Sequence, residues 1–183
     1  MEIKGPHYHL SYETLQPLMV FGSLRHLMIE WSEQISLDDH EVANLARSWP
    51  LLKSLKFYCG RGGYPPFSTK YPTLVGLLSL ATSCPDLRMV ALPLDATQVP
   101  EVEDAEPCNT SLEEIVVLES PIDKALPVAE LLFQHHPGVT KLGTRRFSSP
   151  LETNVVQVSV YEWAWDEVEA YLMSLHGIDS EPE

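Results

Sequence analysis

The fold is decided by a short stretch in the first third of the chain, Trp49-Pro50-Leu51-Leu52-Lys53-Ser54-Leu55-Lys56-Phe57. The stretch recurs as Cys84-Pro85-Asp86-Leu87-Arg88-Met89-Val90-Ala91-Leu92 and as His136-Pro137-Gly138-Val139-Thr140-Lys141-Leu142-Gly143-Thr144. Each copy has a proline, an aliphatic residue two positions later, and another aliphatic residue three positions after that. This repetition predicts that the chain is built from similar units placed one after another.

Two further segments, residues 24–29 and 112–117, carry the same aliphatic spacing without a preceding proline. We call the first aliphatic residue of each motif its anchor, and the five anchors are Leu24, Leu52, Leu87, Leu112 and Val139. Their spacings of 28, 35, 25 and 27 residues centre on the roughly 20–29 residues of a leucine-rich repeat. One such motif is weak evidence because any amphipathic segment can produce it. Five motifs in register predict a leucine-rich-repeat solenoid with one repeat for each anchor.

The segments before the three prolines have the spacing of amphipathic helices. Residues 42–46 place apolar side chains on one face, and Ser36 or Asp38 can cap the start of that helix. Similar apolar faces occur in residues 73–81 and 126–133. Proline lacks an amide hydrogen and disfavours helix in the residue before it, so each helix is expected to end there. The predicted fold class is therefore α/β, a right-handed superhelix with parallel strands on its concave face and helices on its convex face.

The predicted strands also indicate which side chains are buried, because alternate residues of a strand point to opposite faces of its sheet. The predicted core residues are Leu27, Ile29, Trp31, Leu55, Phe57, Cys59, Val90, Leu92, Ile115 and Val117. The residues expected on the opposite face are His26, Met28, Glu30, Lys56, Tyr58, Met89, Ala91, Glu114, Val116, Lys141 and Arg145.

The second set contains the candidate partner-binding residues, which are His26, Met28, Glu30, Lys56, Tyr58, Met89 and Glu114. Strands hold such side chains in place before a partner arrives, which lowers the entropy cost of binding. Aromatic and Met side chains are also enriched in the centres of protein interfaces. The competing interpretation is that these residues are only the solvent-facing half of alternating strands.

Three segments depart from the repeat. A helix weakened by Pro17 is expected at Glu13–Val20, where it would complete a partial first unit. Gly60–Pro72 and Asp95–Thr110 are expected to be inserted loops, and they are the alternative location for a partner site.

The end of the chain is expected to close the solenoid. A helix is predicted at Trp163–Leu175, with one apolar face formed by Trp165, Val168, Leu172 and Leu175. The leucine-rich-repeat domain is therefore predicted to span residues 1–176, followed by a disordered tail at 177–183.

The composition restricts the classes of partner. The net charge is −14, from 26 acidic and 12 basic residues, which argues against nucleic acid because binding phosphates requires Lys and Arg. No apolar run reaches the roughly 18–20 residues that span a bilayer, and the N-terminus lacks the pattern of a signal peptide. The three scattered cysteines indicate reduced thiols. We therefore expect an intracellular protein, cytoplasmic or nuclear, that binds neither nucleic acid nor membrane.

Histidine, glycine and acidic clusters are the candidates for chemistry. His7-Tyr8-His9 and His135-His136 lack cysteine or acidic partners at metal-ligand spacing. Gly60-Arg61-Gly62-Gly63 lacks the ending of a phosphate-binding loop, and Glu101–Glu106 lacks the spacing of a calcium loop. No Gly-x-Ser-x-Gly turn or His-Glu-x-x-His pair occurs. The sequence thus predicts no catalytic residue, no metal and no cofactor, with a hydrolase using the acidic loop or a hidden triad as a remote alternative.

Several motifs are similar to those of a known protein family. They are Ile35–Asp39, Ala46–Leu52, Thr73–Leu77, Cys84–Leu87, Glu119–Ile122 and the Trp165-x-x-Val168 helix. Through them, residues 13–175 resemble the leucine-rich-repeat region of F-box-like proteins of mushroom-forming (basidiomycete) fungi. In that family an N-terminal F-box docks on the adaptor of a cullin–RING ubiquitin ligase, and the repeats hold the protein to be ubiquitinated. The resemblance implies a protein–protein interaction domain that serves as the substrate-recognition part of such a receptor.

The chain departs from this family pattern because no F-box precedes the first repeat. Leu126–Leu132 resembles the Leu-Pro-x-Glu opening of an F-box with one extra residue, but it lies where the repeat requires a helix. The expected partner is an unidentified protein, joined by the ligase adaptor only if an F-box lies upstream. The alternative is a stand-alone scaffold of the same fold without a connection to ubiquitin.

Overall fold

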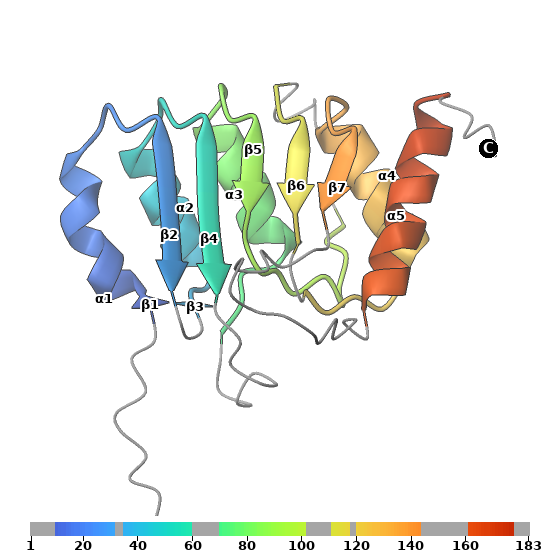
Figure 1. Cartoon of the computed structure of the whole chain (residues 1–183), viewed down its shortest axis with the longest axis horizontal. Coiled ribbons are helices and arrows are strands. Elements are labelled where there is room, and N and C mark those ends of the chain that lie inside the picture. Colours follow the sequence, from blue (N-terminus) through green and yellow to red (C-terminus); the bar gives the residue numbers. More distant parts are fainter. Residues whose placement is uncertain are drawn as a thin grey trace, which may run out of the picture.

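The fold is built around a five-stranded parallel sheet. The computed structural model describes residues 10–31, 35–59, 70–101, 111–117, 120–143 and 161–177. The main sheet of these residues contains β2 (His26–Trp31), β4 (Ser54–Cys59), β5 (Met89–Ala91), β6 (Glu114–Val116) and β7 (Lys141–Gly143). The strands lie in the order β2-β4-β5-β6-β7, and every neighbouring pair is parallel. Each strand therefore lies beside the one that precedes it along the chain (Figure 1).

Helices cover one face of this sheet. The described helices are α1 (Tyr12–Leu15), the 3-10 helix η1 (Gln16–Val20), α2 (Asp39–Ser48), α3 (Leu74–Ser83), α4 (Ala125–His135) and α5 (Glu162–Leu175). Figure 1 shows α2, α3 and α4 behind the sheet and α5 beside β7 at its end. None of these helices combines the length and the apolar composition needed to cross a bilayer. The predicted α/β class with parallel strands is confirmed.

The prolines mark the helix ends as predicted. The helices α2, α3 and α4 are followed by Trp49, Cys84 and His136, each of which immediately precedes a proline. The helix expected at Glu13–Val20 is present but divided, because Pro17 lies in the first turn of η1 and α1 ends before it. Proline cannot donate the amide hydrogen bond that a continuous helix would need there.

The anchors set the register of the main sheet. Each strand begins two residues after its anchor. The residues three positions after the anchors form one row across the sheet, Leu27, Leu55, Val90, Ile115 and Leu142. The carbonyl of the residue after each of the first four anchors accepts two amides of the next repeat, at N–O distances of 2.7–3.3 Å. The register predicted from the sequence is therefore confirmed.

The hydrophobic core lies between the sheet and the helices. Its predicted members in the later strands are buried, namely Leu55, Phe57, Val90, Leu92, Ile115 and Val117. In β2, the predicted Leu27, Ile29 and Trp31 are only half-buried and pack against that core. The difference arises because β2 is the edge strand and has a neighbour on one side only. The Cys59 side chain lies outside the described part of the chain.

A second set of parallel pairings lies outside the main sheet. The strands β1 (Leu10–Ser11) and β3 (Ile35–Ser36) form one pair. Isolated bridges continue the pattern, from Thr73 to Asp95 and from Ala96 to Ile122.

These pairings correct the two loops expected as insertions. The Asp95 amide donates to the Pro72 carbonyl at 2.8 Å, and both Pro72 and Ala96 are buried. The expectation is therefore wrong at the end of Gly60–Pro72 and at the start of Asp95–Thr110, since these residues take part in the parallel pairings. Residues 60–69 and 102–110, which make up most of the two loops, lie outside the described residues.

The helix α5 closes the β7 end of the sheet. It packs against α4 and β7, and its buried residues include the predicted Trp165, Val168 and Leu172. The Glu169 carboxylate accepts the Leu142 amide at 3.2 Å, so a side chain of α5 satisfies an amide on the outer edge of β7. The prediction that Leu175 shares the buried face is wrong, because this side chain is 41% exposed. The predicted tail residues 178–183 and the predicted Arg145 lie outside the described residues.

The residues before the prolines also connect neighbouring repeats. The indole Nε1 of Trp49 donates to the Leu18 carbonyl of η1 at 3.1 Å. The thiol of Cys84 in turn donates to the Trp49 carbonyl at 3.3 Å. Both side chains are fully buried, and burial raises the pKa of the Cys84 thiol to about 11. The thiol therefore stays protonated and remains a hydrogen-bond donor.

A glycine permits the closest contact between two helices, α2 and α3. Both carboxylate oxygens of Asp39 accept hydrogen bonds from Thr73, one from the backbone amide at 2.6 Å and one from the hydroxyl at 2.8 Å. A Cβ atom at Gly76 would lie 2.6 Å from Asp39 Oδ1 and 3.0 Å from Pro72 Cβ. Any larger residue at position 76 would therefore push the two helices apart.

We expect Gly76→Ala to lower the melting temperature, although alanine is the better helix former by about 1 kcal/mol. Overpacking typically costs about 1–3 kcal/mol, and here the added methyl meets a carboxylate fixed by two hydrogen bonds and a rigid proline ring. Thermal unfolding followed by circular dichroism measures the change. Ser79→Ala, a matched control in the same helix, should raise the melting temperature or leave it unchanged. A more stable Gly76→Ala protein would contradict the packing of α2 on α3.

Candidate functional site

Three rows of side chains cross the face of the sheet that points away from α2, α3 and α4, and together they form what we call the open face. The first row contains His26, Ser54, Met89, Glu114 and Lys141. The second row contains Met28, Lys56, Ala91, Val116 and Gly143. The third row contains Glu30 and Tyr58. All seven residues predicted to bind a partner therefore lie on one face, in adjacent rows.

The open face is not uniformly exposed. His26 and Glu30 are exposed, and Met28 is 61% exposed. Lys56 and Glu114 are half-buried. No described helix covers this face, so polar and apolar groups of all five strands remain available there.

Tyr58 corrects the prediction made from strand alternation. It points to the open face as expected, but it is 8% exposed and packs in a small apolar cluster with Ala91, Val116 and the half-buried Met89. Ala91 and Val116, which alternation also placed in the solvent-facing half, are buried too. Gly143 contributes to this packing, because a Cβ atom there would lie 3.0 Å from a methyl group of Val116. The alternation of residues along a strand predicts which face a side chain points to. It does not predict whether residues of the neighbouring strands bury that side chain.

The surroundings of Tyr58 keep its hydroxyl protonated. Burial raises the pKa of Tyr58 above its ordinary value, and the negative charges of Glu114 and Glu30 raise it further. A neutral phenol beside two carboxylates can donate or accept a hydrogen bond but cannot act as a base at neutral pH. The Tyr58 hydroxyl can therefore take part in recognition but is not itself a general base.

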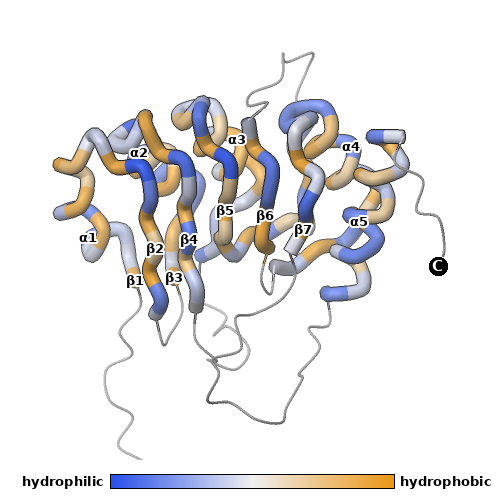
Figure 2. Tube along the Cα trace, turned by 45° about the horizontal axis from the view of Figure 1, so that its top comes forward, coloured by the Kyte–Doolittle hydropathy of each residue, from blue (hydrophilic) through white to orange (hydrophobic). Residues whose placement is uncertain are grey.

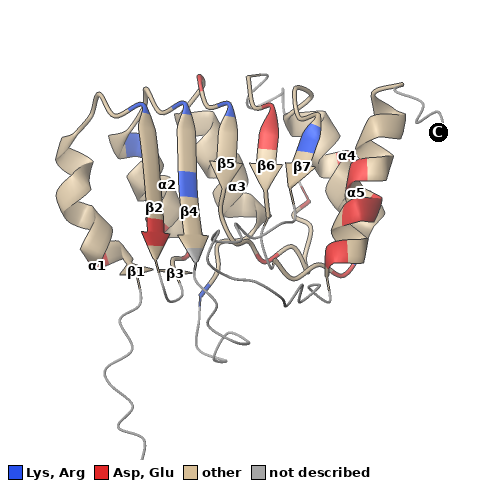
Figure 3. Ribbon diagram, in the orientation of Figure 1, with Lys and Arg blue, Asp and Glu red and all other residues tan. Residues whose placement is uncertain are grey.

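Charges of both signs lie on and around the open face (Figure 3). Lys141 neighbours Glu114 in the first row, and Arg88 forms an exposed ion pair with Glu113 at 3.5 Å. Basic segments stand at the same end of β2, β4 and β5 in Figure 3, where Arg25, Lys53 and Arg88 follow their anchors. A mixed pattern of this kind fits a protein surface better than a uniformly charged polymer.

The histidine, glycine and acidic clusters show no metal site among the described residues. No group of three or more His, Cys, Asp or Glu side chains there could hold a metal ion. His135 is the last residue of α4 and His136 follows it, and both side chains are fully buried. The segments 7–9, 60–63 and 102–106, including most of the acidic cluster, lie outside the described residues.

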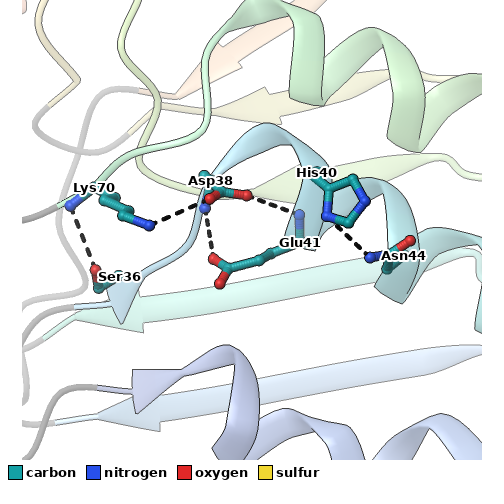
Figure 4. A network of polar contacts seen from close by, with 6 residues as sticks. All are labelled: Ser36, Asp38, His40, Glu41, Asn44 and Lys70. Atoms are coloured by element: carbon teal, nitrogen blue, oxygen red, sulfur yellow. Dashed lines mark hydrogen bonds and ion pairs between the residues drawn. The ribbon is translucent and has the colours of Figure 1, made fainter.

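A network of polar contacts caps the start of α2 (Figure 4). Asp38 accepts the Glu41 amide, and the Glu41 carboxylate accepts the Asp38 amide, both at 2.9 Å. Lys70 lies 3.4 Å from the Asp38 carboxylate and donates its amide to the Ser36 hydroxyl. Such a reciprocal pair is the capping box that stabilises a helix start, so these charges have a structural role.

His40 lies near this network without forming a catalytic pair. Its Nδ1 lies 3.2 Å from the side-chain amide of Asn44, one helical turn away on α2. A general base of a hydrolase would contact a nucleophile and be oriented by a carboxylate. The described residues around His40 supply neither contact, so this network does not support the remote hydrolase alternative.

Comparison with known proteins identifies no family. No protein-family model matches the chain, and no curated protein matches it either. The resemblance to fungal F-box-like proteins therefore stays a prediction from the motifs quoted above. The functional inference depends on the open face and its residues.

The capping network generates a pH prediction. The hydrogen bond from the Glu41 amide, opposed by partial burial and helped by Lys70, holds the pKa of Asp38 below its ordinary value. A carboxyl group with a lowered pKa contributes stability above its unfolded-state pKa, and this contribution is lost as the pH falls through its folded-state pKa. We expect Asp38→Asn, which can still cap but carries no charge, to be less stable than the wild type at neutral pH. The difference should disappear on acidification.

Chemical denaturation of both proteins between neutral pH and the acid limit of folding measures this difference. Asp123→Asn is the control, because Asp123 is exposed and has no hydrogen bond or ion pair in the described part of the chain. A constant difference between wild type and Asp38→Asn at every pH would show that the Asp38 charge has no role in the cap.

Proposed function

We propose that the chain is a leucine-rich-repeat solenoid that binds another protein through its open face. Three features support the solenoid: the sequential order of the parallel strands, the helices α2, α3 and α4 on one face, and the hydrogen-bonding step that recurs between repeats. The single observation that carries the binding proposal is the gathering of all seven predicted residues in three rows of one face.

The residues of the open face suit a protein partner. Met28 offers an exposed apolar surface, and Met side chains adapt to irregular contacts. Glu30 and Lys56 flank it with opposite charges, which favours one orientation of a partner over others. Because the strands hold these groups in place, a partner need not order them on binding. Tyr58 and Met89 belong to the apolar cluster on the same face.

The experiment uses a photo-crosslinking amino acid placed at Met28 or at Lys56 in the full chain. Illumination in cell extract, followed by mass spectrometry of the crosslinked bands, identifies the protein that touches the open face. The same amino acid at Val75 or Leu126 is the matched control, because these side chains are 44% and 43% exposed and lie on α3 and α4. We expect the same protein at both open-face positions and its absence from the control positions.

Truncation then measures the contribution of individual contacts. We expect Met28→Ala and Lys56→Ala to weaken binding of the identified protein by more than about 1 kcal/mol each, the level that separates energetic contacts from neutral ones. Both variants should keep the wild-type melting temperature. Tyr58→Ala is unsuitable for this purpose, because its buried ring makes a loss of stability the expected result. Binding that survives both truncations would place the partner site elsewhere.

The resemblance to F-box-like proteins extends the proposal to ubiquitination. In this extended proposal the open face holds the protein to be ubiquitinated. The alternative is a stand-alone scaffold of the same fold without a connection to ubiquitin. Leu126-Pro127, the F-box-like segment, lies in the first turn of α4, whose Val128, Ala129 and Leu132 are buried in the core. An apolar face buried in this way is not free to dock on another protein.

We therefore expect residues 1–183 alone not to bind the ligase adaptor. Co-expression with the adaptor and purification through a tag on either protein tests this. Stable co-purification would overturn the assignment of α4 to the repeat.

A further inference from the structure

The two ends of the main sheet are finished differently. At β7, the outward amide of Leu142 donates to Glu169 of α5. At the other end, β2 pairs with β4 on one side only, and η1 packs against α2. The outer edge of β2 has no pairing strand among the described residues.

The hydrogen bonds of the sheet identify the groups on this edge. The Arg25 carbonyl accepts the Lys53 and Ser54 amides, so the backbone of Arg25 faces β4. Backbone direction alternates along a strand, so the amide and carbonyl groups of His26, Met28 and Glu30 point outward. Within the described chain no group forms a hydrogen bond with these three residues on the outer side.

The edge is also apolar in its centre. Figure 2 shows the middle of β2 as hydrophobic between polar ends. Met28 is 61% exposed, and Leu27 and Ile29 are half-buried although their row partners in the inner strands are buried. Val20 and Phe21, in the segment before β2, are 78% and 54% exposed. A long, apolar, unpaired edge strand favours pairing with another strand.

We propose that β2 pairs antiparallel with β2 of a second copy of this chain, centred on Met28. In that register Met28 lies opposite its own equivalent, and His26 lies opposite Glu30 of the partner subunit. Two-fold symmetry repeats the His26–Glu30 contact, so the edge is complementary to itself in both hydrogen bonding and charge. All three outward-facing residues of β2 then exchange both backbone hydrogen bonds with the second copy.

Other registers leave this complementarity unused. In a register shifted by one residue, the outward backbone groups of one copy would lie opposite backbone groups of the second copy that already face β4. A shift by two residues places either His26 or Glu30 opposite Met28, and it separates the imidazole from the carboxylate. The centred register therefore gives the largest number of matched groups. It joins the two main sheets into one sheet and places the two open faces side by side.

The self-association is tested by analytical ultracentrifugation of the full chain over a wide concentration range. We expect a concentration-dependent dimer for the wild type. His26→Glu places like charges opposite each other twice, and Glu30→Lys removes the carboxylate that His26 faces. Because both side chains are exposed, each variant should stay folded. We expect His26→Glu to raise the dissociation constant by about tenfold, since opposed like charges destabilise a strand pair.

The double variant His26→Glu with Glu30→Lys exchanges the two charges and should restore dimerisation. Arg47→Glu, an exposed charge reversal on α2, is the matched control and should leave the dimer intact. A second measurement reports the register. In a background with Cys59 and Cys108 replaced by Ser, Met28→Cys should form an intermolecular disulfide on oxidation, because paired residues lie about 5.5 Å apart.

Three results would overturn the proposal: a wild type that remains monomeric at every concentration, charge variants that dimerise as tightly as the wild type, or no covalent dimer from Met28→Cys. The proposal is independent of the proposed function, since oligomeric state requires no partner protein. A dimer whose Met28 and Lys56 positions crosslink to no protein other than the second copy would sustain this inference while removing support for the binding proposal.

Discussion

The carbonyl of the residue after each anchor accepts two amides from the next repeat, and this step occurs four times across the main sheet. It fixes the strands in a register where Leu27, Leu55, Val90, Ile115 and Leu142 form one row. Once this row faces the helices, the neighbouring residues of every strand must face away from them. The core and the open face are therefore two consequences of a single hydrogen-bonding arrangement.

The unequal spacings of the anchors are compatible with this regular sheet because the variation falls outside the strands. Between Leu52 and Leu87 the chain contains residues 60–69, and between Leu87 and Leu112 it contains residues 102–110, all outside the described elements. The connections that return to each strand differ in length, while the distance from anchor to strand stays constant. The register of the strands is therefore independent of the lengths of the loops.

The sequence predicts the features that depend on local rules. The prolines at 50, 85 and 137 mark the helix ends, and the anchors mark the strand starts, because both signals act within a few residues. It also predicts which strand residues share the open face. It does not predict the burial of Tyr58, because that depends on Ala91 in the next strand and Val116 in the strand after it.

Contacts between segments that are distant in the sequence are also not predicted, because they do not depend on local rules. Asp39 and Thr73 are joined by two hydrogen bonds although 34 positions separate them, and Gly76 is explained only by the closeness of α2. The closing helix α5 is predictable from its apolar spacing, whereas the hydrogen bond that its Glu169 carboxylate accepts from the Leu142 amide of β7 is not. Nothing in the sequence around Glu169 indicates that this carboxylate accepts a backbone amide at the edge of a sheet.

The register of the repeats is tested most directly by amide hydrogen exchange, measured residue by residue by nuclear magnetic resonance. The amides of Ser54, Met89, Glu114 and Lys141 each donate to the preceding repeat, although their side chains stand on the open face. We predict that these four amides exchange as slowly as those inside α2, α3 and α4. Exchange of these amides at the rate of unstructured chain, with the helices still protected, would contradict the stacked sheet on which the whole account depends.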